Sequence, residues 1–210
     1  YLRYNSGLQI ASNGRMLAET LETLIGNWAT PVDELVIMGH SMGGLVARSA
    51  CHQGDEAGHV WLKYLRKLVF LGTPHHGALL ERGGHGLDVV MDLSPYSMPL
   101  TRLSKARSAG ITDLRHGTIS VGEDIVPLPP AVKCYAAAAV RAAERSLLGE
   151  RLIGDGLVTP DSALGRHPDS TRMLAIPRSR QWVGYGMGHR ELLNRPEVYE
   201  QISTWLQEPE

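Results

Sequence analysis

The stretch Glu34–Arg48, which reads ELVIMGHSMGGLVAR, decides the interpretation of this sequence. Its apolar run from Leu35 to Met38 has the length of a buried parallel strand, and a helix-forming segment follows Gly43-Gly44. Between the two lies Gly-His-Ser-Met-Gly, whose flanking glycines leave out the Cβ atoms that would collide in a tight strand-to-helix turn. Such a turn exposes the Ser41 hydroxyl and points the N–H groups of the helix start at whatever bonds to it. The stretch therefore predicts acyl-transfer chemistry at Ser41, and the alternative is a Gly-rich turn with a solvated serine.

Composition is typical of one globular domain. The 210 residues are 43% hydrophobic and 20% charged, with a net charge of -1 and no basic stripe, so nucleic acid is not an expected partner. No apolar run reaches the ~18 residues of a membrane span. Cys51 and Cys134 are too few for a disulfide framework and are interpreted as small buried hydrophobic residues. The chain begins at Tyr1 rather than at a methionine, so we expect that the natural N-terminus is absent, and we favour a cytoplasmic location.

The remaining patterns predict alternating helices and strands. The first two apolar strands are separated by about 30 residues, which is the spacing of a βαβ unit and predicts a parallel sheet. The other expected elements are the end of a strand at 1–5, a helix capped by Ser12 or Asn13 and ended by Pro31, a helix from Ser41 to about Gln53, a short helix at 61–65, strands at 67–74 and 133–140, a last strand formed by 171–177 and 181–185 with a bend at Pro177, and a closing helix at 196–207.

The segment from Ala78 to Pro130 has mixed composition, with several prolines and short amphipathic pieces. A structureless loop of this length is uncommon in a compact domain, so we expect an inserted helical cap, whose apolar residues favour an apolar acyl group. The sequence then divides into three parts. Residues 1–77 form the first part of the core with the serine, 78–130 form the cap or lid, and 131–210 form the second part of the core with the acid and the base.

A serine nucleophile needs a base and a group that orients the base. In a sheet of this kind the order is nucleophile, carboxylate, histidine, each on a loop beyond the C-terminal end of a strand. Asp155 is the best carboxylate, because Gly154 and Gly156 let the backbone turn sharply around it. The alternative is an ordinary Asp-Gly turn. Of its rivals, Asp124 precedes the third strand and Asp161 is explained as the cap of a short helix.

The base is predicted to be His189. Among the nine histidines, only His167 and His189 follow Asp155 in the chain. His167 has the composition of a surface loop around it, whereas His189 comes directly after the last strand in a loop with three glycines that can reach toward Ser41. The alternative for His189 is a solvated loop histidine.

Three further histidines lie near the expected site. His75 and His76 follow the second strand as an adjacent pair, but adjacent residues in a turn point apart and no Cys, Asp or Glu accompanies them, so neither a metal nor a cofactor is expected. We expect this pair to pack near the pocket floor. His40 is expected to fix the turn, and His40 and His75 are our predicted substrate-contacting residues.

Four blocks together resemble one enzyme superfamily. They are GHSMGG at 39–44, FLGTPHHG at 70–77, GDGLV at 154–158 and GH at 188–189. These blocks resemble the α/β-hydrolase superfamily, in particular its lipase/esterase branch with the bacterial triacylglycerol lipases and the GPI inositol-deacylase-like proteins. The resemblance implies a mostly parallel sheet flanked by helices, and a small-molecule ester or lipid as substrate.

The resemblance also implies roles for individual residues. Ser41 would attack an ester carbonyl, His189 would take its proton, and Asp155 would hold the imidazole tautomer. The backbone N–H of Met42 would supply one oxyanion donor. In the family the second donor normally follows an earlier strand, often in a His-Gly loop, and residues 1–41 contain no such loop.

We therefore expect that the chain lacks the first strands of its hydrolase. Some of these lipases bind calcium near the histidine loop, but the aspartate that would accompany Glu191 is not evident, so calcium is not expected. Two alternatives stay open beside an ester hydrolase. One is a non-catalytic remnant that serves as a binding domain, and the other is an acyltransferase that uses the same three residues. The oligomeric state is left open.

Overall fold

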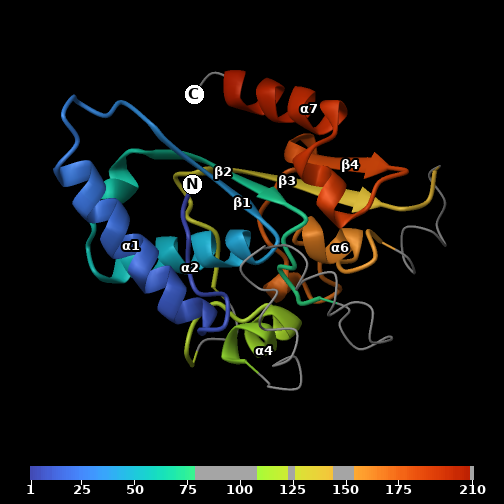
Figure 1. Cartoon of the computed structure of the whole chain (residues 1–210), viewed down its shortest axis with the longest axis horizontal. Coiled ribbons are helices and arrows are strands. Elements are labelled where there is room, and N and C mark those ends of the chain that lie inside the picture. Colours follow the sequence, from blue (N-terminus) through green and yellow to red (C-terminus); the bar gives the residue numbers. More distant parts are fainter. Residues whose placement is uncertain (79–107, 123–125, 144–153, 209–210) are drawn as a thin grey trace.

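The computed structural model describes residues 1–78, 108–122, 126–143 and 154–208. Its centre is a sheet of four parallel strands in the order β1-β2-β3-β4 (Figure 1). The strands are β1 Leu35–His40, β2 Leu65–Leu71, β3 Lys133–Val140 and β4 Gln181–Tyr185. All four C-terminal ends therefore lie at one edge, and the prediction of a parallel α/β sheet is confirmed.

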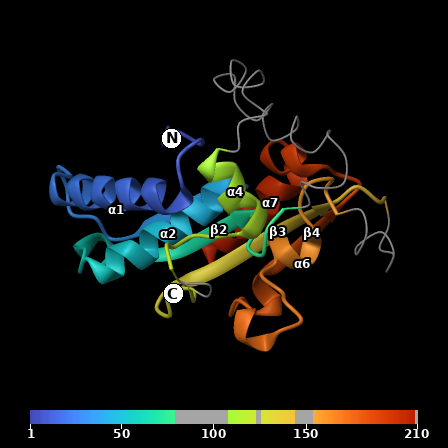
Figure 2. The same cartoon turned by 90° about the horizontal axis from the view of Figure 1, so that it is seen from below.

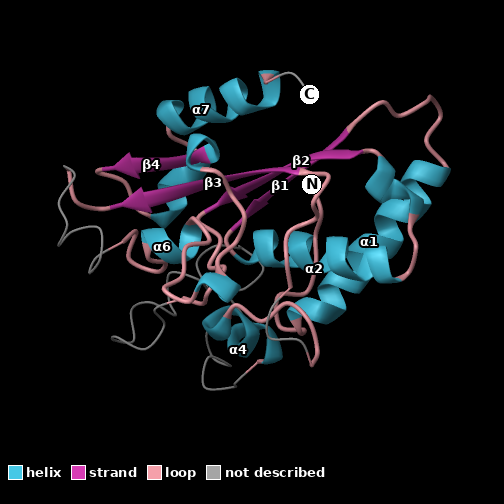
Figure 3. Cartoon of the chain, turned by 180° about the vertical axis from the view of Figure 1, so that it is seen from behind, coloured by secondary structure: helices cyan, strands magenta, loops and turns pink. Residues whose placement is uncertain are grey.

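Helices cover both faces of the sheet. The α1 and α2 helices lie on one face and α7 lies on the other (Figures 1 and 3). Figure 2 shows α1 beside α2, and a Cβ atom at Gly14 of α1 would lie only 2.3 Å from the Ser49 hydroxyl of α2. The helical elements of the described residues are α1 Ile10–Gly26, α2 Met42–Glu56, η1 Val60–Lys63, α4 Ala109–His116, α6 Pro160–Ala163, η3 Ser170–Arg172, η4 Arg178–Arg180, η5 His189–Leu193 and α7 Pro196–Gln207, where η marks a 3-10 helix.

The two central strands alternate between two hydrophobic clusters. Leu68 and Phe70 of β2 belong to the cluster beneath α1 and α2, whereas Val69 and Leu71 belong to the cluster beneath α7. This is the two-residue period of a strand that is buried on both faces. In β3 the run 136–139 consists of alanines, all buried, so small side chains fill both layers at the centre of the sheet.

Several predicted elements are found at or near their expected bounds. The strand at 133–140 and the closing helix at 196–207 are confirmed, and the helix after Ser41 extends to Glu56. The strand expected at 67–74 begins earlier, at Leu65, and ends at Leu71. The short helix expected at 61–65 is the 3-10 turn η1. Most of the predicted cap, residues 79–107 and 123–125, lies outside the described residues, and α4 is a helix within the rest of it.

The strand expected at 171–177 was a wrong prediction. Residues 170–172 and 178–180 form the 3-10 turns η3 and η4, and the strand consists of Gln181–Tyr185 alone. The N–H of Leu174 bonds to the carbonyl of Gly165 at 2.8 Å, so the apolar residues here pair with a neighbouring loop instead of the sheet. Pro177 has no N–H to give to a ladder.

The chain start also differs from the prediction. Residues 1–5 form no strand with the described part of the chain, and α1 begins at Ile10 with Gln9 as its N-cap. Asn13, an expected cap, is instead buried inside the helix, where its side-chain amide donates to the carbonyl of Asn5 at 3.0 Å. No helix in the described ranges combines the length and the apolar character needed to cross a bilayer.

Candidate active site

Ser41 occupies a strained turn between β1 and α2. Its backbone has φ 53° and ψ -126°, and no other non-glycine residue of the described ranges has a positive φ. Such a conformation costs about 1–3 kcal/mol and persists only where surrounding structure holds it. Here the N–H of Ser41 bonds to the carbonyl of Leu71 at the end of β2, at 2.9 Å. This is the geometry of a nucleophile elbow, and the serine is 5% exposed.

Two glycines let the elbow close, but they are not the two that the motif suggests. A Cβ atom at Gly39 would lie 2.6 Å from the Cα of Gly44, and one at Gly44 would lie 2.0 Å from the Thr73 hydroxyl. At Gly43, outside its own helix, a Cβ atom would meet only the Tyr4 hydroxyl, at 3.9 Å. The expectation that a collision requires glycine on both sides of Ser41 therefore holds for Gly39 and is wrong for Gly43.

Asp155 lies on the loop that follows β3. Its neighbours Gly154 and Gly156 have φ 48° and 98°, so the sharp turn predicted from the Gly-Asp-Gly pattern is present. One carboxylate oxygen, Oδ1, accepts the backbone N–H groups of Leu157 at 2.8 Å and Val158 at 2.7 Å. These bonds fix the direction in which the second oxygen points.

His189 begins η5, directly after the loop that follows β4. This loop is tied to the edge of the sheet, because the N–H of Met187 bonds to the carbonyl of Val140, the last residue of β3, at 3.1 Å. Glu191 reinforces the turn by accepting the N–H of Gly188 at 2.7 Å. The imidazole then packs on the backbone at the end of β2, where a Cβ atom at Gly72 would lie 2.9 Å from the ring Cε1.

The two loops bring Asp155 and His189 into contact. The Oδ2 atom of Asp155 lies 2.5 Å from Nδ1 of His189, and each side chain is 1% exposed. The other ring nitrogen, Nε2, is buried and makes no hydrogen bond to any described residue. The hydroxyl of Ser41 is therefore not bonded to it. Ser41 is held against Leu71 and the imidazole packs on the next residue, Gly72, so both groups converge on the C-terminal end of β2.

One backbone donor and a second imidazole lie next to Ser41 and His189. Met42 is the first residue of α2, so its N–H has no partner within the helix. His40 lies against His189, since its Nε2 is 3.1 Å from the carbonyl oxygen of His189 and the two rings are 4.7 Å apart. Burial, followed by the charge of His189, lowers the pKa of His40 to about 4. A neutral His40 can donate Nε2–H to that carbonyl.

Comparison with protein families covers the part of the chain that contains Ser41. The model of the PGAP1-like alpha/beta domain matches residues 5–125, more than half of the chain. The chain belongs to this family. The match contains β1, the elbow and β2, whereas Asp155 and His189 lie beyond it. A search among curated proteins gave no match.

Solved structures that resemble this PGAP1-like chain show its fold. The mature lipase BlEst2 of Bacillus licheniformis is 19% identical, with a TM-score of 0.57 over 95% of this chain and 75% of the lipase. Its propeptide form is 20% identical, with a TM-score of 0.61 over 97% of this chain and 42% of that one. The metagenomic carboxyl esterase MGS0156 is 15% identical, with a TM-score of 0.58 over 98% of this chain and 64% of the esterase. At these identities the likeness establishes the α/β-hydrolase fold.

The PGAP1-like domain places His75 away from Ser41, Asp155 and His189. His75 is 3% exposed, meets Phe70 edge to face at 4.7 Å, and lines a cavity whose lining includes none of those three residues. His76 also lines this cavity, and its ring lies 4.9 Å from that of His167, the rejected candidate for the base, at an interplanar angle of 59°.

Asp161 and Asp124 were the alternatives to Asp155 as the acid. Asp161 lies in the first turn of α6, which Thr159 caps, and it faces Arg166 at 3.8 Å. Asp124 lies outside the described residues. No group of three or more His, Cys, Asp or Glu side chains in the described ranges is arranged to hold a metal ion.

Two residues of this region were not anticipated. Gly72 supports the imidazole of His189. The sequence signal for this contact was a glycine directly after an apolar strand. Arg48 is 6% exposed in the middle of α2, on a helix whose neighbouring residues Leu45 to Ala47 are buried. A charged residue within so apolar a run was a signal for an unusual site.

Proposed function

We propose that this protein is a serine hydrolase that cleaves carboxylic esters through an acyl-enzyme intermediate on Ser41. The observation that carries the proposal is the pairing of Asp155 with His189 Nδ1 beside a strained serine, with Nε2 left unbonded. This set of groups is what activation of a serine hydroxyl requires. The names of the similar structures, a lipase and a carboxyl esterase, support the same reaction class.

In the first half of the reaction, the Ser41 hydroxyl oxygen attacks the ester carbonyl carbon while Nε2 of His189 takes the hydroxyl proton. The carbonyl oxygen becomes an oxyanion, which accepts the N–H of Met42 at the start of α2. The tetrahedral intermediate then collapses. Its C–O bond to the alcohol breaks, the imidazolium returns its proton to the leaving alkoxide, and the acyl group remains on Ser41.

In the second half, water replaces the alcohol. Nε2 of His189 takes a proton from the water as its oxygen attacks the acyl carbon, and the same proton returns to Ser41 when the acid leaves. Asp155 stays ionised throughout, because its part is to hold the ring and to stabilise the imidazolium. Small-molecule esters and lipids are the proposed substrates.

Covalent labelling with a fluorophosphonate tests the proposal. We expect the reagent to add to Ser41, identified by mass spectrometry of the labelled peptide, and to abolish hydrolysis of a nitrophenyl ester in proportion to labelling. The Ser41→Ala variant is the control and should neither label nor hydrolyse. The same protein denatured beforehand is a second control and should not label, since labelling should require the folded site.

The outcomes separate the alternatives. A folded protein that neither labels nor hydrolyses any ester would favour a remnant that serves as a binding domain. A labelled protein that transfers the acyl group to an added alcohol in preference to water would be an acyltransferase, because the same acyl-enzyme then reacts with a different acceptor.

A further inference from the structure

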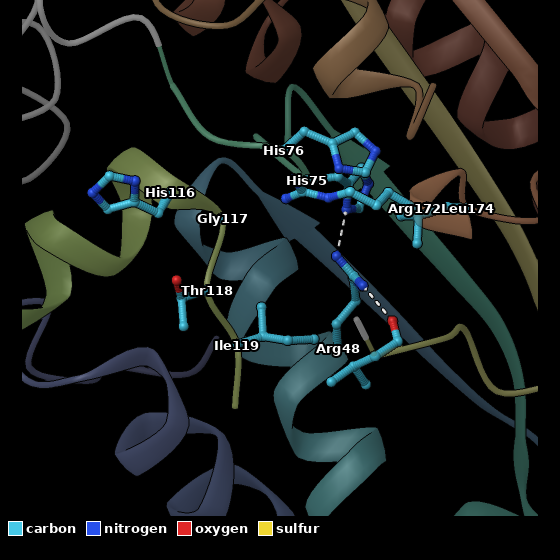
Figure 4. Close-up of a pocket in the computed structure, with 10 residues that line it drawn as sticks. Arg48, His75, His76, His116, Gly117, Thr118, Ile119, Arg172 and Leu174 are labelled. Atoms are coloured by element: carbon cyan, nitrogen blue, oxygen red, sulfur yellow. Dashed lines mark hydrogen bonds between the residues drawn. The ribbon is translucent and has the colours of Figure 1, made fainter. Parts of the chain in front are cut away.

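The buried guanidinium of Arg48 faces a cavity of about 340 Å³ beside α2 (Figure 4). Its Nη2 donates to the carbonyl of Val126 at 2.7 Å, and its Nη1 lies 3.4 Å from Nδ1 of His75. Its Nε is buried without a partner in the described residues. No carboxylate within those ranges pairs with it. The cavity therefore contains a buried cation whose charge is not neutralised by any neighbour described.

Apart from Thr118, the polar side chains that line the cavity carry nitrogen groups. Five of its ten lining residues are basic, and none is acidic. Figure 4 shows Arg48 rising from α2 toward His75, with His76 and Arg172 close by and His116 on the side of α4. Of these, Arg172 is exposed at the surface.

Buried hydrogen-bond donors of this cavity lack acceptors among the described residues. Burial lowers the pKa of His75 well below its ordinary value, so its ring is neutral and Nδ1 can accept from Arg48. The proton of that ring then lies on Nε2, which is buried and unbonded among the described residues, as is Nε of Arg48. Burial lowers the pKa of Arg48 to about 10, so the guanidinium stays charged at neutral pH. Unpaired buried charges and donors are strongly unfavourable, and a ligand that only accepts hydrogen bonds would satisfy them.

We propose that this cavity is a binding site for an oxyanion, a phosphate or carboxylate group held by Arg48 and Arg172. The planar fork of a guanidinium matches both anions. The site is separate from the hydrolytic one, since Ser41 lies seven residues before Arg48, about 10 Å away along the helix axis. It does not depend on the proposed function, and its anion is either free or the head group of a larger molecule.

Calorimetric titration of the whole chain with inorganic phosphate, at ionic strength held constant with chloride, tests the proposal. We expect saturable binding to one site. Arg172→Gln should raise the dissociation constant about tenfold or more, because a charged donor is lost. Arg178→Gln removes an equal charge outside the cavity and should change the dissociation constant by less than about twofold. Ser41→Ala should bind phosphate like the parent, whatever its activity.

Arg48→Gln should abolish phosphate binding in protein whose circular dichroism is that of the parent, and Arg172→Gln decides the matter if that variant fails to fold. A comparison of phosphate with glycerol phosphate identifies the source, since tighter binding of the ester indicates a head group and tighter binding of phosphate a free anion. Absence of binding of both phosphate and acetate, titrated in the same way, or equal phosphate affinity in Arg172→Gln, overturns the proposal. Binding only in a Glu123→Gln/Asp124→Asn variant also overturns it, because a carboxylate of the chain itself would then be the occupant.

Discussion

The carboxylate of Asp155 determines which nitrogen of His189 carries the proton. Its Oδ2 lies 2.5 Å from Nδ1, while its Oδ1 is engaged by the N–H groups of Leu157 and Val158. An ionised carboxylate can only accept, so Nδ1 must donate. In the neutral ring the lone pair is then on Nε2, which is the atom left unbonded. The contact with Asp155 thus leaves Nε2 as the nitrogen of His189 that can accept a proton.

Asp155→Asn should reverse this tautomer and leave the fold intact. The asparagine carbonyl would keep the bonds from Leu157 and Val158, so its amide N–H groups would face Nδ1 and the ring proton would move to Nε2. A base whose Nε2 carries a proton cannot accept one from Ser41. We expect kcat for a nitrophenyl ester to fall about 10³–10⁴-fold.

The matched control is Asp161→Asn, because this carboxylate is 64% exposed and faces Arg166 at 3.8 Å. It should leave kcat within about twofold of the parent, since exposed ion pairs contribute little. A larger loss of kcat in Asp161→Asn than in Asp155→Asn would reverse the assignment of the acid.

A pair of adjacent glycines tests the elbow. Gly44→Ala would place a Cβ atom 2.0 Å from the Thr73 hydroxyl, so we expect the free energy of unfolding to fall by at least about 3 kcal/mol, or the protein not to fold. Gly43→Ala would meet only the Tyr4 hydroxyl at 3.9 Å and should be neutral or stabilising by up to about 1 kcal/mol, as alanine favours a helix. Urea unfolding of both variants measures the difference. Equal destabilisation would show that Gly43, too, is required by packing.

The local part of the site is the part that the sequence predicts well. Ser41 can be identified from the sequence because the pattern that predicts its strained turn lies within five consecutive residues. Asp155 and His189 follow from one topological fact, that parallel strands end at the same edge and that loops beyond that edge meet. The structure brings those two side chains together. Their assignment to steps of a reaction stays a prediction.

Features that depend on distant contacts were missed. Arg48 is buried by Val126, 78 residues away, and by His75, 27 residues away, and nothing in α2 itself indicates either contact. The stretch 171–177 has the apolar content of a strand. The N–H of Leu174 nevertheless bonds to the carbonyl of Gly165, so this stretch does not pair with the sheet. Local propensity does not decide between two such partners.

The pH dependence of stability should reflect His40. Its pKa is about 4 when folded and near 6.5 when unfolded, because burial and the charge of His189 disfavour the cation. Between these values the unfolded chain binds a proton that the folded chain does not, so the free energy of unfolding falls as the pH falls. From about pH 7.5 to about pH 5 the contribution of His40 is about 2 kcal/mol.

His40→Gln keeps a donor for the carbonyl of His189 but cannot be protonated. We therefore expect the variant to lose about 2 kcal/mol less stability than the parent over the same pH range, measured by urea unfolding. The pKa of buried His75 is lowered in the same direction, so part of the slope should remain in the variant. Parallel pH profiles for the two proteins would show that His40 is protonated as easily in the folded state as in the unfolded one.

Lys67 attaches the closing helix to the sheet. This β2 residue is 3% exposed, and its Nζ donates to the carbonyl oxygens of Leu206 at 2.7 Å and Glu208 at 2.8 Å, at the C-terminal end of α7. A cation is favourable there, because the last carbonyls of a helix lack partners and carry its negative dipole end. Lys67→Met should lower the free energy of unfolding by about 2–4 kcal/mol without changing kcat. Exposed Lys63 is the control, and Lys63→Met should change stability by less than about 0.5 kcal/mol. If urea unfolding finds the two variants equally stable, the bonds from Lys67 do not hold α7 to the sheet.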